Sequence, residues 1–289
     1  MRERAGELYI IGGTLLWGLF PVLATISYTN VSPFISLSVS SLFSALFFAA
    51  VLTIRHRWSE LTNIKALKYS LYATFFIGVL YYLLYFLGIR YTSPGNVSIL
   101  ALTEVFFSYL LFHVWHKDYI PKEHIAGALL MLIGACIVLA PSVGAFRPAN
   151  LFILAGAAIV PFGNFFVQKA RKLVSTETIM FTRGIIGSLV IWLLSVPFHA
   201  TNSVAEVKQS LIFLIINGVL LLGVSTFLWI EGIHRITVTK ANALNSLSPL
   251  VTLLFAWIFL KTAPTPWQLL SFVPLFFGVI LIGKIPKKS

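Results

Sequence analysis

Long stretches without charged residues divide this sequence, and they constrain the fold more than any other feature. Eight stretches lack Asp, Glu, Lys and Arg altogether, and they cover residues 8–27, 31–54, 69–89, 125–146, 148–168, 209–230, 241–260 and 262–283. Two more, 94–115 and 178–198, each contain one charged residue, Glu104 and Arg183. A membrane-spanning helix needs about 20 consecutive apolar residues. Barrel strands alternate in polarity and these stretches do not, so the sequence predicts an all-α integral membrane protein with ten transmembrane helices.

The composition agrees with a chain that lies mostly in lipid. Of the 289 residues, 58% are hydrophobic and 10% are charged, against about 25% charged in an average soluble domain. These values exclude a disordered chain and a soluble enzyme of ordinary composition. Cys136 is the only cysteine, so a disulfide framework within the chain is excluded as well.

The basic residues are distributed unevenly between the two sides of the predicted membrane protein. With the N-terminus inside, the inside segments contain 16 of the 21 Lys and Arg residues, and the outside loops contain Arg90, Arg147, Lys208 and Lys261. This asymmetry follows the positive-inside rule. It predicts a multi-pass protein of the cytoplasmic (inner) membrane with both termini cytoplasmic. The net charge of +12 is then explained by topology and contact with the lipid bilayer, and a nucleic-acid partner is not expected.

Short sequence matches at one nearly constant offset indicate an internal repeat. Gly88-Ile89 corresponds to Gly232-Ile233, an offset of 232 − 88 = 144, and residues 133–135 (IGA) correspond to residues 277–279 (FGV) at the same offset. We therefore expect two repeats of five helices, residues 1–145 and 146–289. Because five is odd, the second repeat must be inverted relative to the first. Inverted repeats are common in secondary transporters, whose substrate sites lie near the bilayer midplane.

Glu104 is the sharpest candidate site residue, because it falls near the middle of a predicted span. A charged side chain there costs at least about 2.5–3.5 kcal/mol, so it must face protein, a partner or water. On a continuous helix it shares a face with Val97, Ala101, Ser108 and Leu111, which suits a cavity wall or tight packing. We expect a site that couples transport to protons or binds a cation. The alternative is a protonated, hydrogen-bonded structural glutamate.

Other polar or amphipathic side chains inside the spans are candidates for substrate binding. With Glu104, the set comprises Trp17, Tyr82, Asn164, Trp229, Asn242, Asn245 and Ser246. Tyr81 and Tyr85 in the third span, and Ser225 and Thr226 in the eighth, could complete a pocket lining. For each of these residues, helix packing is the alternative role. Arg183 could extend to the membrane interface, or pair with Glu104 or a substrate carboxylate.

Enzyme and cofactor motifs are absent from the sequence. It contains no phosphate-binding loop, dinucleotide fingerprint or nucleophile elbow, so we expect no cofactor and no catalytic residues. His113 and His116 have a helical spacing that could bind a metal, but they adjoin a charged loop, and a solvated loop is the expectation there. A membrane-embedded enzyme acting on lipid carriers is therefore a weak alternative, and a non-transporting subunit is another.

Three hydrophobic motifs carry a resemblance to a known family. They are residues 16–21 (LWGLFP), 242–250 (NALNSLSPL) and 277–282 (FGVILI). With the five-plus-five arrangement, the chain resembles the EamA-type family of the drug/metabolite transporter superfamily. The resemblance implies transport of a small metabolite across the inner membrane, often amino-acid export. Family members often carry a Gly-Glu pair after the fourth and ninth helices, where this chain has His116-Lys117 and Lys261-Thr262, so no role of that Glu can be transferred.

Taken together, these features predict a secondary transporter that exports an amino acid or related metabolite by alternating access. Uptake or exchange of a nucleobase, cofactor or sugar is the alternative, because the fold does not fix direction. The few strong polar groups in the spans favour a weakly polar or zwitterionic small-molecule substrate, with protons as a candidate second partner.

Overall fold

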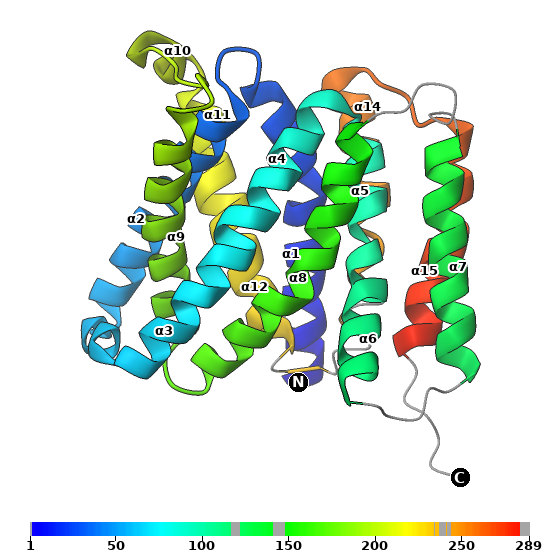
Figure 1. Ribbon diagram of the computed structural model, residues 1–289, viewed down its shortest axis with the longest axis horizontal. Helices are drawn as coiled ribbons and strands as arrows, with labels where there is room; N and C mark the ends of the chain where they lie inside the picture. Colours follow the sequence, from blue (N-terminus) through cyan, green and yellow to red (C-terminus); the bar gives the residue numbers. More distant parts are fainter. Residues whose placement is uncertain are drawn as a thin grey trace.

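Helices and short turns make up the computed structural model, which describes residues 2–116, 122–140, 148–233, 235, 236, 241 and 244–283 (Figure 1). The first half contains α1 (Arg2–Ser27), α2 (Pro33–Ile54), η1 (Trp58–Thr62), α3 (Ile64–Ala73), η2 (Thr74–Tyr81), α4 (Tyr82–Tyr91), α5 (Pro94–Ala101), α6 (Thr103–His116) and α7 (Lys122–Leu139). The second half contains α8 (Pro148–Arg171), α9 (Thr176–Ser195), α10 (Val204–Gln209), α11 (Leu211–Ile216), η4 (Asn217–Val224), α12 (Ser225–Ile233), α14 (Ser248–Leu260) and α15 (Pro266–Gly283).

Eight of the helical segments in the described part are long and apolar enough to cross a membrane, and the apolar helices α14 and α15 are shorter. A helix is the expected form for such segments, because it satisfies its backbone polar groups internally in lipid. The segments coincide with the apolar stretches found in the sequence. The predicted ninth span, 241–260, differs, because its regular helix α14 begins only at Ser248.

Serine and proline fix several helix starts. Ser32 and Ser93 cap α2 and α5 with their side-chain oxygens, and Pro33 and Pro94 follow them as the first helical residues. A proline costs little there, because the first N–H groups of a helix have no partner within the helix. The last apolar stretch of the sequence begins at residue 262, whereas α15 begins at Pro266.

Two antiparallel helix pairs are packed through small residues. In Figure 1, α7 and α15 lie side by side at the right and α2 and α9 at the left, and both pairs make extensive contacts. A Cβ atom on Gly127 would lie 2.8 Å from the carbonyl oxygen of Gly278, and one on Gly184 would lie 2.9 Å from that of Ser41. Because glycine has no side chain, these backbones can approach closely, as is typical of helix contacts in membranes.

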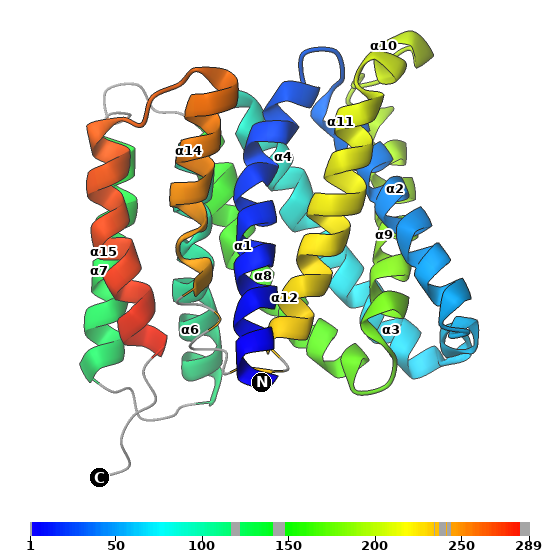
Figure 2. The same cartoon turned by 180° about the vertical axis from the view of Figure 1, so that it is seen from behind.

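The centre of the molecule is built around α1 and α8. Helix α1 packs against α12 and α14, and α8 packs against α3, η2, α4 and α6 (Figures 1 and 2). The Thr252 hydroxyl donates to the carbonyl oxygen of Gly18 at 2.7 Å, which joins α14 to α1. Helix α1 begins and α15 ends at the lower edge of Figure 1, which we call the N-terminal face.

Four helical segments are irregular near the middle of the molecule. Leu102 separates α5 from α6, and a turn at Ser246 and Leu247 precedes α14. The segments η2 and η4 are π-helical, each eight residues long. π-Helical turns and broken helices occur mostly at functional sites, so these irregularities mark the region where a site is expected.

A polar network ties α2 to α9 at the N-terminal face. Glu177, 3% exposed, forms an ion pair with Arg55, and Arg57 lies 4.0 Å from the same carboxylate. Glu60 accepts hydrogen bonds from the Ser175 N–H at 2.6 Å and from the Thr178 hydroxyl at 2.7 Å. This network fixes the loop after α2 onto the first turn of α9.

Glu60 is expected to make the stability of the protein depend on pH. Partial burial raises the pKa of Glu60. The hydrogen bonds from Ser175 and Thr178 and the charge of Arg57 lower this pKa by more, so that it lies below 4.5. Glu60 therefore stabilises the fold above about pH 4.5, and that contribution is lost as the pH falls through its folded pKa. Glu60→Gln should cost about 1–2 kcal/mol at pH 7 and much less near pH 3. The measurement is the thermal unfolding of both proteins at both pH values. An equal difference in stability between variant and wild type at pH 7 and pH 3 would contradict this prediction.

Candidate functional site

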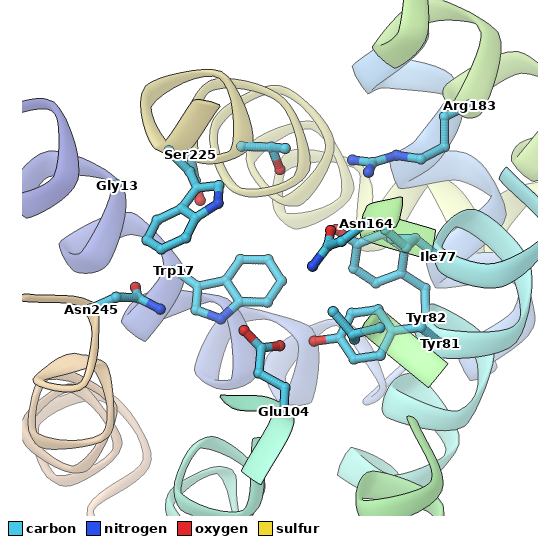
Figure 3. A pocket seen from close by; sticks show the side chains of 13 residues that line it. Gly13, Trp17, Ile77, Tyr81, Tyr82, Glu104, Asn164, Arg183, Ser225 and Asn245 are labelled. Carbon is cyan, nitrogen blue, oxygen red and sulfur yellow. The ribbon is translucent and has the colours of Figure 1, made fainter. Parts of the chain in front are cut away.

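A cavity lies where α1, η2, α6, α8, α9 and α12 meet (Figure 3), and its total space of about 680 Å³ includes the part that is open to solvent. Its aromatic lining comprises Trp17, Tyr81, Tyr82 and Trp229. Its polar lining comprises Glu104, Asn164, Arg183, Ser225, Thr226 and Asn245. A mostly apolar wall with a few convergent polar groups is typical of small-molecule sites.

Buried aromatic rings close the cavity on the side away from the N-terminal face. Phe20 stacks on Trp17 at 5.0 Å between ring centroids and on Tyr85 at 5.6 Å, and Phe86 lies 5.5 Å from Phe20. Phe20, Tyr85 and Phe86 are at most 1% exposed. We call these three rings the aromatic layer. The Tyr28 hydroxyl donates to the carbonyl oxygen of Phe86 at 3.1 Å, which ties the end of α1 to α4 beyond the layer.

The cavity is not enclosed, because Asn164 on its wall is an exposed residue. Since the aromatic layer closes the opposite side, the position of Asn164 in the second half of α8, toward the N-terminal face, indicates where the cavity opens.

Glu104 lies in the first turn of α6, and its carboxylate points toward Trp17 in Figure 3. The N-terminus of a helix carries a partial positive charge that favours an anion. Because the helix is interrupted at Leu102, Glu104 lies at the start of a new helix in the middle of the molecule. Among the described residues, Glu104 takes part in no ion pair.

Arg183 extends from α9 into the same cavity (Figure 3). It is 8% exposed, and its guanidinium carbon lies 5.7 Å from the centre of the Tyr82 ring. Gly78 in η2 makes room for it, because a Cβ there would lie 2.9 Å from Cγ of Arg183. Arg183 is thus directed inward rather than to the interface. In the described part of the chain it has no carboxylate within ion-pair distance.

Six of the eight residues that the sequence singled out line this cavity: Trp17, Tyr82, Glu104, Asn164, Trp229 and Asn245. The structure places Ser246 elsewhere, since it is fully buried in the turn before α14 and is not part of the lining. Asn242 lies outside the described residues, as do the side chains of His113 and His116. The described residues include no group of three or more His, Cys, Asp and Glu that could hold a metal ion.

The sequence did not single out the apolar lining residues Gly13, Ile77 and Val160. Apolar side chains on a cavity wall look the same in the sequence as those in a packed core. A weak signal existed for Ile77 alone, since it lies one turn before Tyr81 on the same helix.

A second, smaller cavity lies on the other side of Trp17. Its lining includes Tyr85, Ser98, Glu104, Asn245 and Ser248. Trp17, Glu104 and Asn245 border both cavities, so these three residues separate them. The Thr14 hydroxyl donates to Oδ1 of Asn245 at 3.3 Å, which helps to hold that amide in place.

Comparison with known proteins gives a consistent result over the whole chain. The sequence model of the EamA-like transporter family matches residues 4–140 and again residues 147–284. The chain is 24% identical to the uncharacterized transporter YyaM of Bacillus subtilis over 71% of this chain and 70% of that protein. It is 21% identical to the uncharacterized transporter YoaV of the same organism, over 95% and 93%.

A relative that matches half of the chain and a solved structure agree with this. The human solute carrier family 35 member G1 is 31% identical over 50% of this chain and 38% of its own length. One crystal structure superimposes with a TM-score of 0.70 over 96% of each chain at 20% identity, which shows a shared fold. Because the family model covers nearly all of the sequence, this chain belongs to the EamA-like transporter family.

Proposed function

We propose that this protein is a secondary transporter that carries an amino acid or a related small zwitterion out of the cell by alternating access, driven by a cation gradient through Glu104. The structure then corresponds to the state whose cavity opens toward the N-terminal face. The family match and the relatives named as transporters support transport over catalysis.

One observation carries the choice of substrate. Glu104 and Arg183 extend from α6 and α9 into the same cavity (Figure 3) without forming an ion pair. Opposite charges that are withdrawn from water and not paired are costly to maintain. A solute with an ammonium and a carboxylate group would satisfy both at once, and the filled cavity would stay electrically neutral.

The remaining lining fits a small solute of this kind. Trp17, Tyr82 and Trp229 supply apolar surface for a side chain, and Asn164 and Asn245 supply donors and acceptors. Among the described residues, the lining contains one arginine and no lysine, so a multiply charged phosphate ester is disfavoured. Uptake or exchange of a nucleobase, cofactor or sugar remains the alternative.

The packing supports two inverted repeats of five spans, residues 1–145 and 146–289. The first span packs on the eighth and ninth, and the sixth packs on the third and fourth. The second set of contacts is the first set with the two repeats interchanged, as expected if the repeats are equivalent. The π-helical segments η2 and η4 begin at Thr74 and Asn217, an offset of 217 − 74 = 143. The helix breaks at Leu102 and Leu247 are offset by 247 − 102 = 145, and the family model matches each half once.

The membrane and orientation follow from the basic residues. The polar network of Arg55, Arg57, Glu60 and Glu177 lies on the N-terminal face. With the 16 Lys and Arg residues predicted on that side, it supports a cytoplasmic N-terminal face in the cytoplasmic membrane.

Transport in proteoliposomes tests this proposal and the role of Arg183 together. Vesicles are loaded with labelled amino acids, and efflux is compared with that of the matching amines that lack the carboxylate. We expect amino acids to leave and amines to stay. Arg183→Gln should lower amino-acid flux at least tenfold, because the variant cannot pair a carboxylate, and Arg183→Lys should retain part of it.

Arg57→Gln is the matched control, since Arg57 lies outside the cavity and should leave flux unchanged. Equal flux of acids and amines through wild type would contradict the zwitterion proposal. If neither class moves, then nucleobases, cofactors and sugars are the substrates to test next.

A further inference from the structure

The second cavity differs in character from the first. Its polar lining consists mainly of oxygen-bearing groups, from Tyr85, Ser98, Glu104, Asn245 and Ser248, and none of its described residues is basic. It has room for only about one water-sized particle. An amino acid does not fit there, whereas a single small ion does.

The Tyr85 hydroxyl is a buried polar group without a partner. Tyr85 is 1% exposed, and its hydroxyl makes no hydrogen bond. The ring packs against Phe20, at 5.6 Å, and Trp17, at 6.2 Å, so the hydroxyl cannot turn elsewhere without disturbing the aromatic layer. A buried polar group that is left unsatisfied costs free energy, and an occupant of the cavity would remove this cost.

The interrupted fourth span adds backbone dipoles at the same place. Helix α5 ends at Ala101, and the N–H of Leu102 bonds to the carbonyl oxygen of Ile99 at 3.2 Å, three residues back. Both Ala101 and Leu102 line the cavity. The last carbonyl groups of a helix carry a partial negative charge, and the ends of broken helices in membranes are used to bind cations.

We propose that the cavity behind Trp17 binds one dehydrated Na⁺ ion, with the Glu104 carboxylate as its counter-charge and the neutral oxygens of Tyr85, Ser98, Asn245 and Ser248 available around it. This inference rests on the proposed function, because it names the ion that drives transport. Hard cations prefer oxygen ligands. A single carboxylate compensates a monovalent ion more fully than a divalent one, so a monovalent ion is favoured.

Glu104 then connects the ion to the substrate. It borders both cavities, as do Trp17 and Asn245. The other titratable or charged side chains at these cavities are Tyr81, Tyr82, Tyr85 and Arg183. Arg183 does not line the ion cavity, so the ion faces one negative group and no positive one. An occupied ion cavity fixes the position of the Glu104 carboxylate, and this presents it to an ammonium group in the first cavity.

Equilibrium binding of ²²Na⁺ to the purified protein in nanodiscs, without substrate, tests the site. NaCl is varied against choline chloride at constant ionic strength and pH. We expect saturable binding of one ion per chain, and weak competition by K⁺. Tyr85→Phe removes only the hydroxyl and should weaken binding at least fivefold, and Glu104→Gln should abolish it. Tyr72→Phe, the same chemical change at a residue that lines neither cavity, should leave Na⁺ affinity within twofold of wild type.

The outcomes separate this inference from the proposed function. Saturable binding that Tyr85→Phe weakens supports the ion site even if no amino acid is transported, in which case the proposed substrate is wrong. Absence of saturable Na⁺ binding to folded wild-type protein overturns the site, even if a proton gradient drives amino-acid export. Equal binding by wild type and Tyr85→Phe overturns it too. A melting curve for each variant confirms that the protein is folded, and Ser248→Ala provides a second test if Tyr85→Phe does not fold.

Discussion

Replacing Glu104 with glutamine is expected to abolish the accumulation of substrate against its gradient, while downhill exchange continues at a reduced rate. Glutamine has nearly the same shape but can neither take up a proton nor balance a bound cation. The accumulation ratio in proteoliposomes should therefore fall to about one under either a proton or a Na⁺ gradient. The variant should still fold, because Glu104 forms no ion pair among the described residues and the change removes a buried charge.

Glu231→Gln is the matched control for this experiment. Glu231 also lies in an apolar helix, but it pairs with Arg235 at 2.6 Å, one turn away, and lines neither cavity. It should keep the wild-type accumulation ratio. An unchanged ratio in Glu104→Gln would show that Glu104 is a structural residue and that no gradient acts through it.

The second large effect is expected at a helix contact rather than at the site. A Cβ atom on Gly218 in η4 would lie 2.2 Å from the carbonyl oxygen of Ser40 and 2.7 Å from Cβ of Phe43. Both are backbone or backbone-adjacent atoms of α2, so no side-chain rotation relieves the overlap. Gly218→Ala must therefore push η4 away from α2. We expect a loss of about 3 kcal/mol, which exceeds the gain of about 1 kcal/mol in helix propensity.

The measurement for Gly218→Ala is the temperature at which half of the detergent-solubilised protein loses its monodisperse peak in size-exclusion chromatography. Gly12→Ala is the control, because a Cβ there would meet only Cδ1 of Leu228, at an ordinary 3.5 Å. That variant should melt within a few degrees of wild type. If both alanine variants melted alike, close packing of η4 on α2 would not limit stability.

Length and hydropathy were sufficient to predict the eight helices that are long and apolar enough to cross a membrane. They were not sufficient to predict the break at Leu102, which no adjacent proline or glycine marks, whereas Pro249 is consistent with a helix that begins at Ser248. The break at Leu102 had a consequence at the site. A continuous helix would align Val97 with Glu104, whereas the break turns α5 so that Ser98 faces the second cavity instead.

The candidate site could be predicted in part, and for a physical reason. Trp17, Glu104 and Asn245 were identified because polar and amphipathic groups are costly in lipid and must be accounted for. Ser246 satisfied the same criterion, yet it is fully buried in a turn, because a small hydroxyl can be satisfied locally. The inward direction of Arg183 depends on the space that Gly78 leaves on a different helix, and a single sequence does not reveal such a tertiary contact.

The aromatic layer of Phe20, Tyr85 and Phe86 has an electrical consequence. If the cavity opens toward the N-terminal face, as proposed above, water in it would carry the potential of that side up to Trp17, and the transmembrane voltage would fall mainly across the short distance that these rings fill. A membrane potential of 100 mV corresponds to about 2.3 kcal/mol for each elementary charge that crosses it. In this arrangement a charge moving by little more than the depth of one ring layer would cross most of that field, and the same rings would insulate the cell against leakage of the gradient.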